Sequence, residues 1–435
     1  MTTLRRRALG RLAVFATAVA VACKLVAFDP LTAARRRHTD ALFSSSGTSM
    51  TAPRYSGFYT PTQVADAATA AHAGTHPYAA ALAAQLVLPG TVLYSDGKGN
   101  PARYLEMAER THAVVTLSVP SVYVNGTSEE TAASLNANKS AVAGLTGDAD
   151  AAHALAVLYR MTGEEQYAAA ASKILMAWAL TNTGAEPHER DVDGHSVEDD
   201  APLDMAEVAS GFVLAADLLT THYTGWGVND PNAVDFRRWV RDVYLPSVEG
   251  IMWPDMKNNW ADWALYAYVL GHAYLGQVAQ ITDIIPIAQQ MIDQQIAIDG
   301  SLPEEVARGL SGAIFYSYFA LNPLCAAVRV IRNTTGTDLF RWTSPSRKTL
   351  PLALNHLLAW VKTPGAYTGP RLQDPWPADL FLLVGAEYGG GAGAYAGSSS
   401  AAYTAYAATK PNQPIIYINQ LESTNFQSLM AVPGQ

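Results

Sequence analysis

The chain has little cysteine and little charge. Two of its 435 residues are cysteines, and 15% are charged. A disulfide framework is therefore not expected, and Cys325 would be a lone buried thiol. Basic blocks are missing outside the N-terminus and the net charge is −9, which argues against nucleic acid as a partner. Hydrophobic residues make up 49% of the chain, which is enough for a large core.

The first residues combine positive charge with an apolar run. Four arginines precede or border the apolar residues 12–22, and Lys24 follows them. This pattern is typical of a signal peptide or a signal anchor, which we expect over residues 1–34. Lys24 keeps the run shorter than the roughly 18–20 residues that a membrane span needs, so a cleaved signal or a weak anchor is favoured. We expect a secreted or extracellular protein that contacts a membrane only through this segment.

Composition also divides the rest of the chain. A Ser/Thr-rich linker is expected over residues 35–52 and a single domain over residues 53–435. The C-terminal part of this domain contains the low-complexity stretch "YGGGAGAYAGSSSAAY". Strand-like alternation is limited to "AVVTLSVP" and "PIIYINQL".

Apolar residues repeat at helical spacing through most of the domain. In "DAAHALAVLYRMTGEEQYAAAASKILMAWAL", two apolar stripes are separated by a turn at Thr162-Gly163. Helix hairpins in which alternate helices are more apolar predict an all-α fold, which we refine to an incomplete (α/α) toroid with long polar loops. Further helices are expected at about Pro202–Thr221, Pro231–Val248, Asn259–Leu275, Ile284–Ile296, Pro303–Arg332 and Lys348–Val361.

Two asparagines and two tryptophans crowd the start of the apolar helix in "NNWADWALYAYVLGHAYLG". Capping by Asn259, with Asp262 at the third helical position, explains one asparagine. It leaves Asn258, Trp260 and Trp263 without a reason. Aromatic rings beside side-chain amides are common in sugar-binding sites, because the ring covers C–H surface while the amide binds oxygens. Helix capping and sugar binding are both compatible with this stretch.

A second stretch, "DGSLPEEVARGLSGAIFYSYFALNPL", places Arg308 before Tyr316 and Tyr318. A salt-bridged arginine and two packed tyrosines would be the ordinary interpretation. Two glycines between the arginine and the tyrosines loosen the helix. Helical-face geometry therefore does not establish that Arg308 and Tyr316 meet.

Together these stretches resemble the helical-toroid polysaccharide lyases, the alginate lyase-like group that includes glucuronan-cleaving relatives. The resemblance covers about Ala143 to Val361. It is carried by "LYRMTGEEQYAAAASKILMAWA", by "NNWADWALYA" as a paired-asparagine helix, and by the Arg-then-Tyr stretch, in that order.

The resemblance implies roles for these residues and an acidic polysaccharide as the substrate. Asn259 would help to bind the uronate carboxylate at the cleaved linkage, with Asn258 beside it. Arg308 would neutralise or position the same region. Tyr316 would be the catalytic tyrosine, with Tyr318 as a rival because the spacing from the arginine is one residue longer than in the family.

Trp260 departs from the family pattern, since the alginate-cleaving members commonly have a histidine directly after the asparagine pair. The resemblance implies β-elimination, in which the C5 proton and the C4 oxygen of a uronate leave. In β-D-glucuronate and β-D-mannuronate both leave from the same side, so one tyrosine can take the proton and return it to the oxygen. The tryptophan therefore favours glucuronan or polymannuronate, cleaved by syn elimination, and Trp260 or Trp263 would shape the sugar-binding wall.

His195, in "DVDGHSVEDD", is a further candidate for substrate binding in a loop over the cleft, although a surface histidine without a role is the simpler interpretation. The surrounding aspartates match no standard metal-binding loop. We therefore expect no metal and no cofactor.

Two other functions stay open on the sequence. A helical-toroid glycoside hydrolase would need paired carboxylates, for which Asp255, Asp262, Glu304 and Glu305 are available. A non-catalytic carbohydrate-binding relative would keep the fold without the activity.

Overall fold

The structure is a computed structural model that describes part of the chain. The described residues are 57–60, 115–117, most of 148–185, parts of 190–197, most of 201–252, all of 257–362, 366–369 and single residues elsewhere up to 388. The chain forms two compact units, Met1–Met50 and Thr51–Gln435, and the described residues belong to the second. The signal segment, the linker and the low-complexity stretch predicted above lie outside the described residues.

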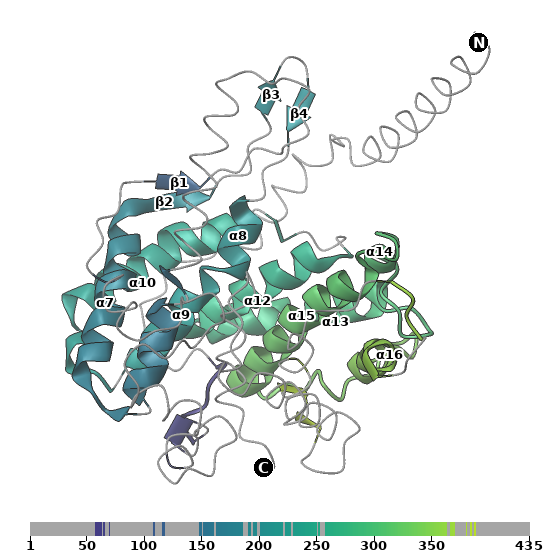
Figure 1. The fold of residues 1–435 in the computed structure, drawn as a ribbon. Coiled ribbons are helices and arrows are strands. Elements are labelled where there is room, and N and C mark those ends of the chain that lie inside the picture. Colours follow the sequence, from purple (N-terminus) through teal and green to yellow (C-terminus); the bar gives the residue numbers. More distant parts are fainter. Residues whose placement is uncertain are drawn as a thin grey trace. The chain divides into compact units, whose positions relative to one another are not determined.

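Within the described residues, the second unit consists almost entirely of helices (Figure 1), which confirms the predicted all-α class. The longer helices are α7 (Glu165–Thr181), α12 (Asn259–Tyr274), α13 (Val278–Gln295), α15 (Ala313–Thr335) and α16 (Leu350–Lys362). The shorter ones are α8 (Ala201–Glu207), α9 (Ser210–Leu219), α10 (Pro231–Trp239), α11 (Leu245–Glu249) and α14 (Pro303–Val306). A 3₁₀ turn, η1 (Thr224–Trp226), and a π-helical turn, η2 (Val240–Tyr244), lie between them.

The predicted helical pair before residue 182 is present. Gly163 ends the first helix in the left-handed region at φ 75°, which glycine adopts without a Cβ penalty, and its N–H donates to the Tyr159 carbonyl at 2.7 Å. The indole of Trp178 in α7 donates to the Asp148 carboxylate at 2.9 Å and so joins the two helices. The described residues of the two apolar stripes are all buried: Ala154, Leu155 and Leu158 in the first helix, and Tyr167, Ile174, Leu175 and Trp178 in α7.

Two short pairs of strands accompany the helices. β1 (Val115–Leu117), inside "AVVTLSVP", pairs in parallel with β2 (Asn182–Ala185), which follows α7 directly. β3 (Arg190–Val192) and β4 (His195–Val197) form an antiparallel pair. The second predicted strand stretch, "PIIYINQL", lies outside the described residues.

The expected helix over 303–332 is broken, and this break matters for the site. α14 ends at Val306 and α15 begins at Ala313. Gly309 lies between them at φ 82°, in the left-handed region, so the chain changes direction there. The expected helix over 202–221 is similarly divided into α8 and α9.

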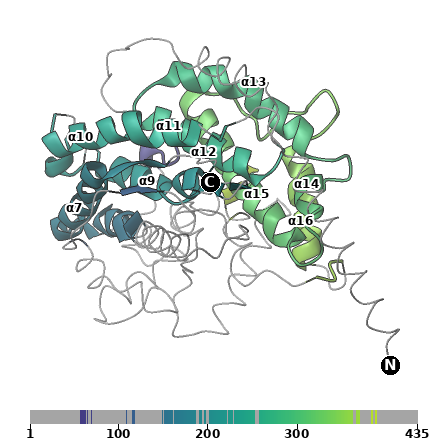
Figure 2. The ribbon, with the colours of Figure 1, turned by 90° about the horizontal axis from the view of Figure 1, so that it is seen from above.

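α12 and α15 are the central helices. α12 packs most extensively against α15 among the described elements, and it also contacts α8, α9, α11 and α13. In both views these two helices lie between α7 and α10 on one side and α16 on the other (Figures 1 and 2). α15 is long and apolar enough to cross a membrane, but 89% of its apolar window is buried inside the protein, as in the core helix of a globular domain.

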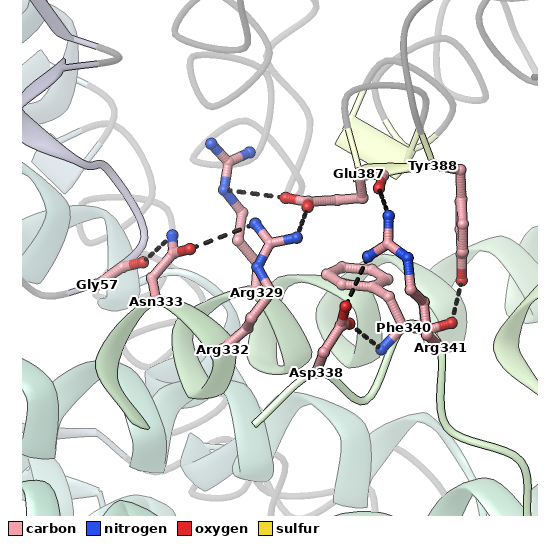
Figure 3. Close-up of polar contacts among 9 residues, drawn as sticks. All are labelled: Gly57, Arg329, Arg332, Asn333, Asp338, Phe340, Arg341, Glu387 and Tyr388. Atoms are coloured by element: carbon pink, nitrogen blue, oxygen red, sulfur yellow. Dashed lines mark hydrogen bonds and ion pairs between the residues drawn. The ribbon is translucent and has the colours of Figure 1, made fainter. Parts of the chain in front are cut away.

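The C-terminal half of α15 is joined to segments from both ends of the domain (Figure 3). Arg329 and Arg332 both reach the carboxylate of Glu387, with Arg329 Nε 3.7 Å from Glu387 Oε1. The amide of Asn333 donates to the Gly57 carbonyl at 2.7 Å. The C-terminal end of α15 is therefore held by residues that lie before it and after it in the chain.

Candidate active site

The site begins where α12 begins. Asn258 has an extended backbone (φ −138°, ψ 179°), and its side chain accepts a hydrogen bond from the backbone N–H of Trp260 at 3.1 Å. Asn258 is therefore the N-cap, and the prediction that Asn259 caps this helix is wrong, because Asn259 is already the first helical residue. Capping uses one asparagine and leaves the other for a different contact.

That contact is with Glu305 in α14. The backbone N–H and the side-chain Nδ2 of Asn259 both donate to Glu305 Oε1, at 2.7 Å and 2.9 Å. The backbone N–H belongs to the first turn of α12, where N–H groups have no partner inside the helix and attract negative charge. Asn259 and Glu305 are each 1% exposed, so this contact forms the buried end of the site.

Glu305 also holds Arg308. The second oxygen of the same carboxylate, Oε2, accepts from Arg308 Nε at 2.8 Å. The two residues are three apart across the end of α14, which brings their side chains to one face. Arg308 is 35% exposed along its side chain, so the network runs from the core at Asn259 to the surface at Arg308.

Arg308 and Tyr316, whose meeting the sequence left open, are in contact. The guanidinium carbon of Arg308 lies 4.0 Å from the centroid of the Tyr316 ring. In an unbroken helix Phe315 would be nearer to the face of the arginine, but the break at Gly309 changes the register. Phe315 instead stacks on Phe319, with 5.4 Å between the ring centroids. The Tyr316 hydroxyl has no hydrogen-bond partner among the described residues.

Two further residues support this geometry. A Cβ on Gly312 would lie 3.1 Å from the Tyr316 ring and 3.7 Å from the Arg308 Cβ, so the absence of a side chain there makes room for the contact. Tyr367 bridges the helix break, because its hydroxyl donates to the Leu310 carbonyl and accepts from the Ile314 N–H.

The other predicted aromatic residues are placed differently. Tyr318 is fully buried, and its hydroxyl accepts from the Asn322 amide at 3.4 Å, so it belongs to the core rather than to the surface around Arg308. Trp263 is also fully buried, against Tyr266 and Phe319, which does not agree with a sugar-binding wall. Trp260 is half-buried at the start of α12, beside the two asparagines.

His195 lies in β4 rather than in a loop, with its backbone opposite Val192. Only its backbone belongs to the described part of the chain, so its part in substrate binding stays a prediction. Within the described residues no three His, Cys, Asp or Glu side chains are grouped as a metal site would require.

From the sequence, Glu305 was predicted only as a candidate hydrolase carboxylate. The Glu-x-x-Arg spacing from Glu305 to Arg308 was a usable signal for the pair. The contact between Glu305 and Asn259 had no signal in the sequence, because the two residues are 46 positions apart.

Among the described residues, Asp262, Glu304 and Glu305 do not form the pair that a hydrolase needs. Asp262 is fully buried and Glu305 is bound on both oxygens. Burial raises the pKa of Asp262 well above its usual range, and the nearby Glu305 raises it further while Gln295 opposes the shift. Glu304 is exposed, and Asp255 lies outside the described residues.

Solved structures of similar fold are alginate lyases. An alginate lyase from Bacteroides ovatus matches with a TM-score of 0.56 and 16% identity, over 84% of this chain and 98% of that one. A tyrosine-to-phenylalanine variant of alginate lyase A1-III, from Sphingomonas species A1, complexed with a tetrasaccharide, matches with a TM-score of 0.52 and 14% identity, over 90% and 100%. A histidine-to-alanine variant of the same lyase, also with a tetrasaccharide, gives 0.51 and 14%, over 83% and 99%. No curated protein sequence matches the chain.

These similarities define the class, a helical lyase scaffold, and they confirm the predicted (α/α) toroid. The alginate lyase family model matches residues 91–367, which is well over half of the chain. The chain therefore belongs to the alginate lyase family and is a polysaccharide lyase.

Proposed function

We propose that this lyase cleaves a glucuronan- or polymannuronate-type polysaccharide by syn β-elimination. The observation that carries the proposal is the connected set of Asn259, Glu305, Arg308 and Tyr316, with Trp260 where the alginate-cleaving members commonly have a histidine. The set supplies amide and guanidinium donors and one phenol.

The N–H donors of Arg308 and Asn259 would offset the negative charge of the substrate carboxylate. The C5 proton of a uronate is very weakly acidic while the adjacent carboxylate is charged, so donors must offset that charge and stabilise the enolate-like intermediate. Arg308 has five N–H donors, of which Nε is used by Glu305, and Asn259 has a second N–H on Nδ2. Arg308 lies at the surface, so its remaining N–H groups would meet the substrate carboxylate there, while Asn259 lies at the buried end of the same set.

Tyr316 would move the proton. Its phenolate oxygen takes the proton from C5, and the electron pair of the C5–H bond forms the new C4–C5 double bond. The C4–O bond then breaks, and the phenol returns the same proton to the leaving oxygen. Arg308 lies over the Tyr316 ring, so a cation stands beside the place where the proton is moved.

Trp260 supports the choice of polymer. Elimination from guluronate removes the two groups from opposite sides and calls for a second catalytic group, whereas an indole neither takes nor gives a proton under these conditions. A tryptophan beside the asparagine pair instead offers an apolar face to a sugar ring.

The compartment is part of the proposal. The basic and apolar N-terminus is typical of a secreted chain, which would meet a polysaccharide outside the cell. Mass spectrometry of the protein recovered from the culture medium of its host would test this and would show whether residues 1–34 are removed.

The test of function is a comparison of pure polymers. Glucuronan, polymannuronate and polyguluronate are incubated with the full chain, and the near-ultraviolet absorbance of the unsaturated sugar is followed. We expect growth of absorbance with glucuronan or polymannuronate, and slower growth or none with polyguluronate. Faster cleavage of polyguluronate contradicts the syn preference. New reducing ends without absorbance would indicate hydrolysis, and binding of a polymer without cleavage would indicate a non-catalytic relative.

A further inference from the structure

We propose that Glu305 is a positioning residue of this site, whose one carboxylate fixes Asn259 and Arg308 relative to each other. For its activity measurement the inference rests on the proposed function, while a binding measurement described below does not need catalysis.

The two oxygens of Glu305 have separate tasks. Oε1 accepts both N–H groups of Asn259, which fixes the rotamer of that side chain against its own backbone. Oε2 accepts from Arg308 Nε, which fixes the plane of the guanidinium. A shift of this single carboxylate would therefore displace the amide and the guanidinium together.

Arg308 depends on this contact more than most arginines do. It lies outside a regular helix, directly before Gly309 with its left-handed backbone. Within the described part of the chain, no second acceptor is hydrogen-bonded to Arg308. Without Glu305, the guanidinium keeps its stack on Tyr316, and a stack leaves its rotation in the ring plane free.

The charge of the cluster is consistent with this task. Burial raises the pKa of Asp262, in the first turn of α12, which disfavours a second negative charge beside Glu305. The negative charge of Glu305 is balanced by Arg308 and by the N-terminal end of α12. A buried carboxylate that is satisfied on both oxygens holds its partners rigidly.

A purely structural role is the competing explanation, and Glu305→Gln separates the two. The glutamine oxygen can still accept from Asn259, but its amide nitrogen cannot accept from Arg308. Glu304→Gln is the matched control, because Glu304 is the preceding residue of the same helix and is exposed. Both variants are compared with the wild type for kcat, KM and melting temperature on the polymer that is cleaved best.

We expect Glu305→Gln to lower kcat on the order of 10²-fold with a smaller change of KM, which is the size of losing one well-placed donor. Glu304→Gln should stay close to the wild type. In the double variant Glu305→Gln/Arg308→Ala, kcat should lie within about threefold of Arg308→Ala alone, because the carboxylate acts through the arginine. A lower melting temperature with normal kcat, or fully additive losses, overturns the proposal.

A second measurement, the affinity for tetrasaccharides, tests the positioning role without relying on cleavage. Affinity for mannuronate and glucuronate tetrasaccharides is measured by calorimetry in a Tyr316→Phe background, with and without Glu305→Gln. Loss of affinity with Glu305→Gln supports positioning even if no polymer is cleaved by the wild type, in which case the proposed function fails by itself. If Glu305→Gln does not fold, Glu305→Asp keeps the charge, and its shorter side chain should retain one partner and lose the other. Unchanged affinity and kcat in the folded variant overturn the inference.

Discussion

One carboxylate oxygen of Glu305 accepts both the backbone and the side-chain N–H of Asn259, which lies 46 residues earlier in the chain. The contact joins the start of α12 to α14 and thereby to Arg308 and Tyr316. It also separates the tasks of the two adjacent asparagines, since Asn258 caps the helix and Asn259 enters the network.

Asn258→Ala and Asn259→Ala should therefore fail in different ways. Loss of the cap at Asn258 should lower the free energy of unfolding by about 1 kcal/mol and leave kcat per folded molecule near normal. Loss of the amide at Asn259 should lower kcat on the order of 10²–10³-fold, in addition to a stability cost from the hydrogen bond to Glu305. Urea unfolding and initial rates on both variants test this, and equal effects on kcat would contradict it.

Tyr316→Phe should all but abolish elimination in a folded protein, because the phenol oxygen is the group that carries the proton. Tyr318→Phe should be much milder for activity, since its hydroxyl is buried in the core and accepts a hydrogen bond from the Asn322 amide. Absorbance growth and circular dichroism on the pair decide between the two tyrosines. A dead Tyr318→Phe with an active Tyr316→Phe would reverse the assignment.

Gly312→Ala should impair activity more than stability. Its Cβ would lie 3.1 Å from the Tyr316 ring, which would have to move away from Arg308. Gly309→Ala is the control, because no atom lies within 4 Å of the added Cβ but the residue has φ 82°. That variant should lose about 1 kcal/mol of stability through backbone strain. The ratio of kcat loss to melting-temperature loss should be larger for Gly312→Ala, and the opposite order would disprove the close-approach explanation.

Asp262→Asn should change how stability depends on pH. Burial raises the pKa of Asp262, so above the ordinary pKa of about 3.9 the folded state keeps a proton that the unfolded state releases. This residue therefore makes the wild type less stable as pH rises, by up to about 1.4 kcal/mol per pH unit. The Asn variant lacks this dependence, so its stability relative to the wild type should increase between pH 5 and pH 8.

Urea unfolding at several pH values measures that difference. Asp283→Asn, on the exposed side of α13, is the control and should run parallel to the wild type. A constant difference between Asp262→Asn and the wild type over this range would mean that Asp262 is ionised in the folded protein.

Glu387→Ala should destabilise the domain strongly. Arg329 is fully buried and Arg332 partly so, and removing their shared carboxylate leaves two positive charges together (Figure 3). Breaking a buried ion pair on one side costs about 3–5 kcal/mol. Asp235→Ala, which removes an exposed pair with Arg238, should cost less than about 1 kcal/mol.

The same variant tests the separation of the two ends of α15. Tyr316 and Arg329 are 13 residues apart in that helix, or roughly 20 Å along its axis. The kcat of the folded fraction of Glu387→Ala should therefore stay close to the wild type. A large loss of kcat in fully folded protein would show that the cluster at Glu387 acts on the site.

The sequence did not predict how exposed individual aromatic side chains are. Trp260 and Trp263 are alike by type and three positions apart, yet one is half-buried and the other fully buried against Tyr266 and Phe319. α12 is apolar around most of its circumference, so its sequence does not indicate which side neighbouring helices cover. The same holds for Tyr316 and Tyr318 in α15.

The sequence by itself determined the helices, the turn at Gly163, and the residue types that stand at the start of α12 and around Arg308. These depend on neighbours within one or two turns, through apolar spacing, glycine conformations and local donors and acceptors. The tertiary structure alone decided which asparagine binds Glu305, that Arg308 lies over Tyr316, and that Glu305 joins Asn259 to Arg308. Burial and the hydrogen-bond partner of a side chain are set by elements that pack from distant parts of the chain, and no local pattern contains that information.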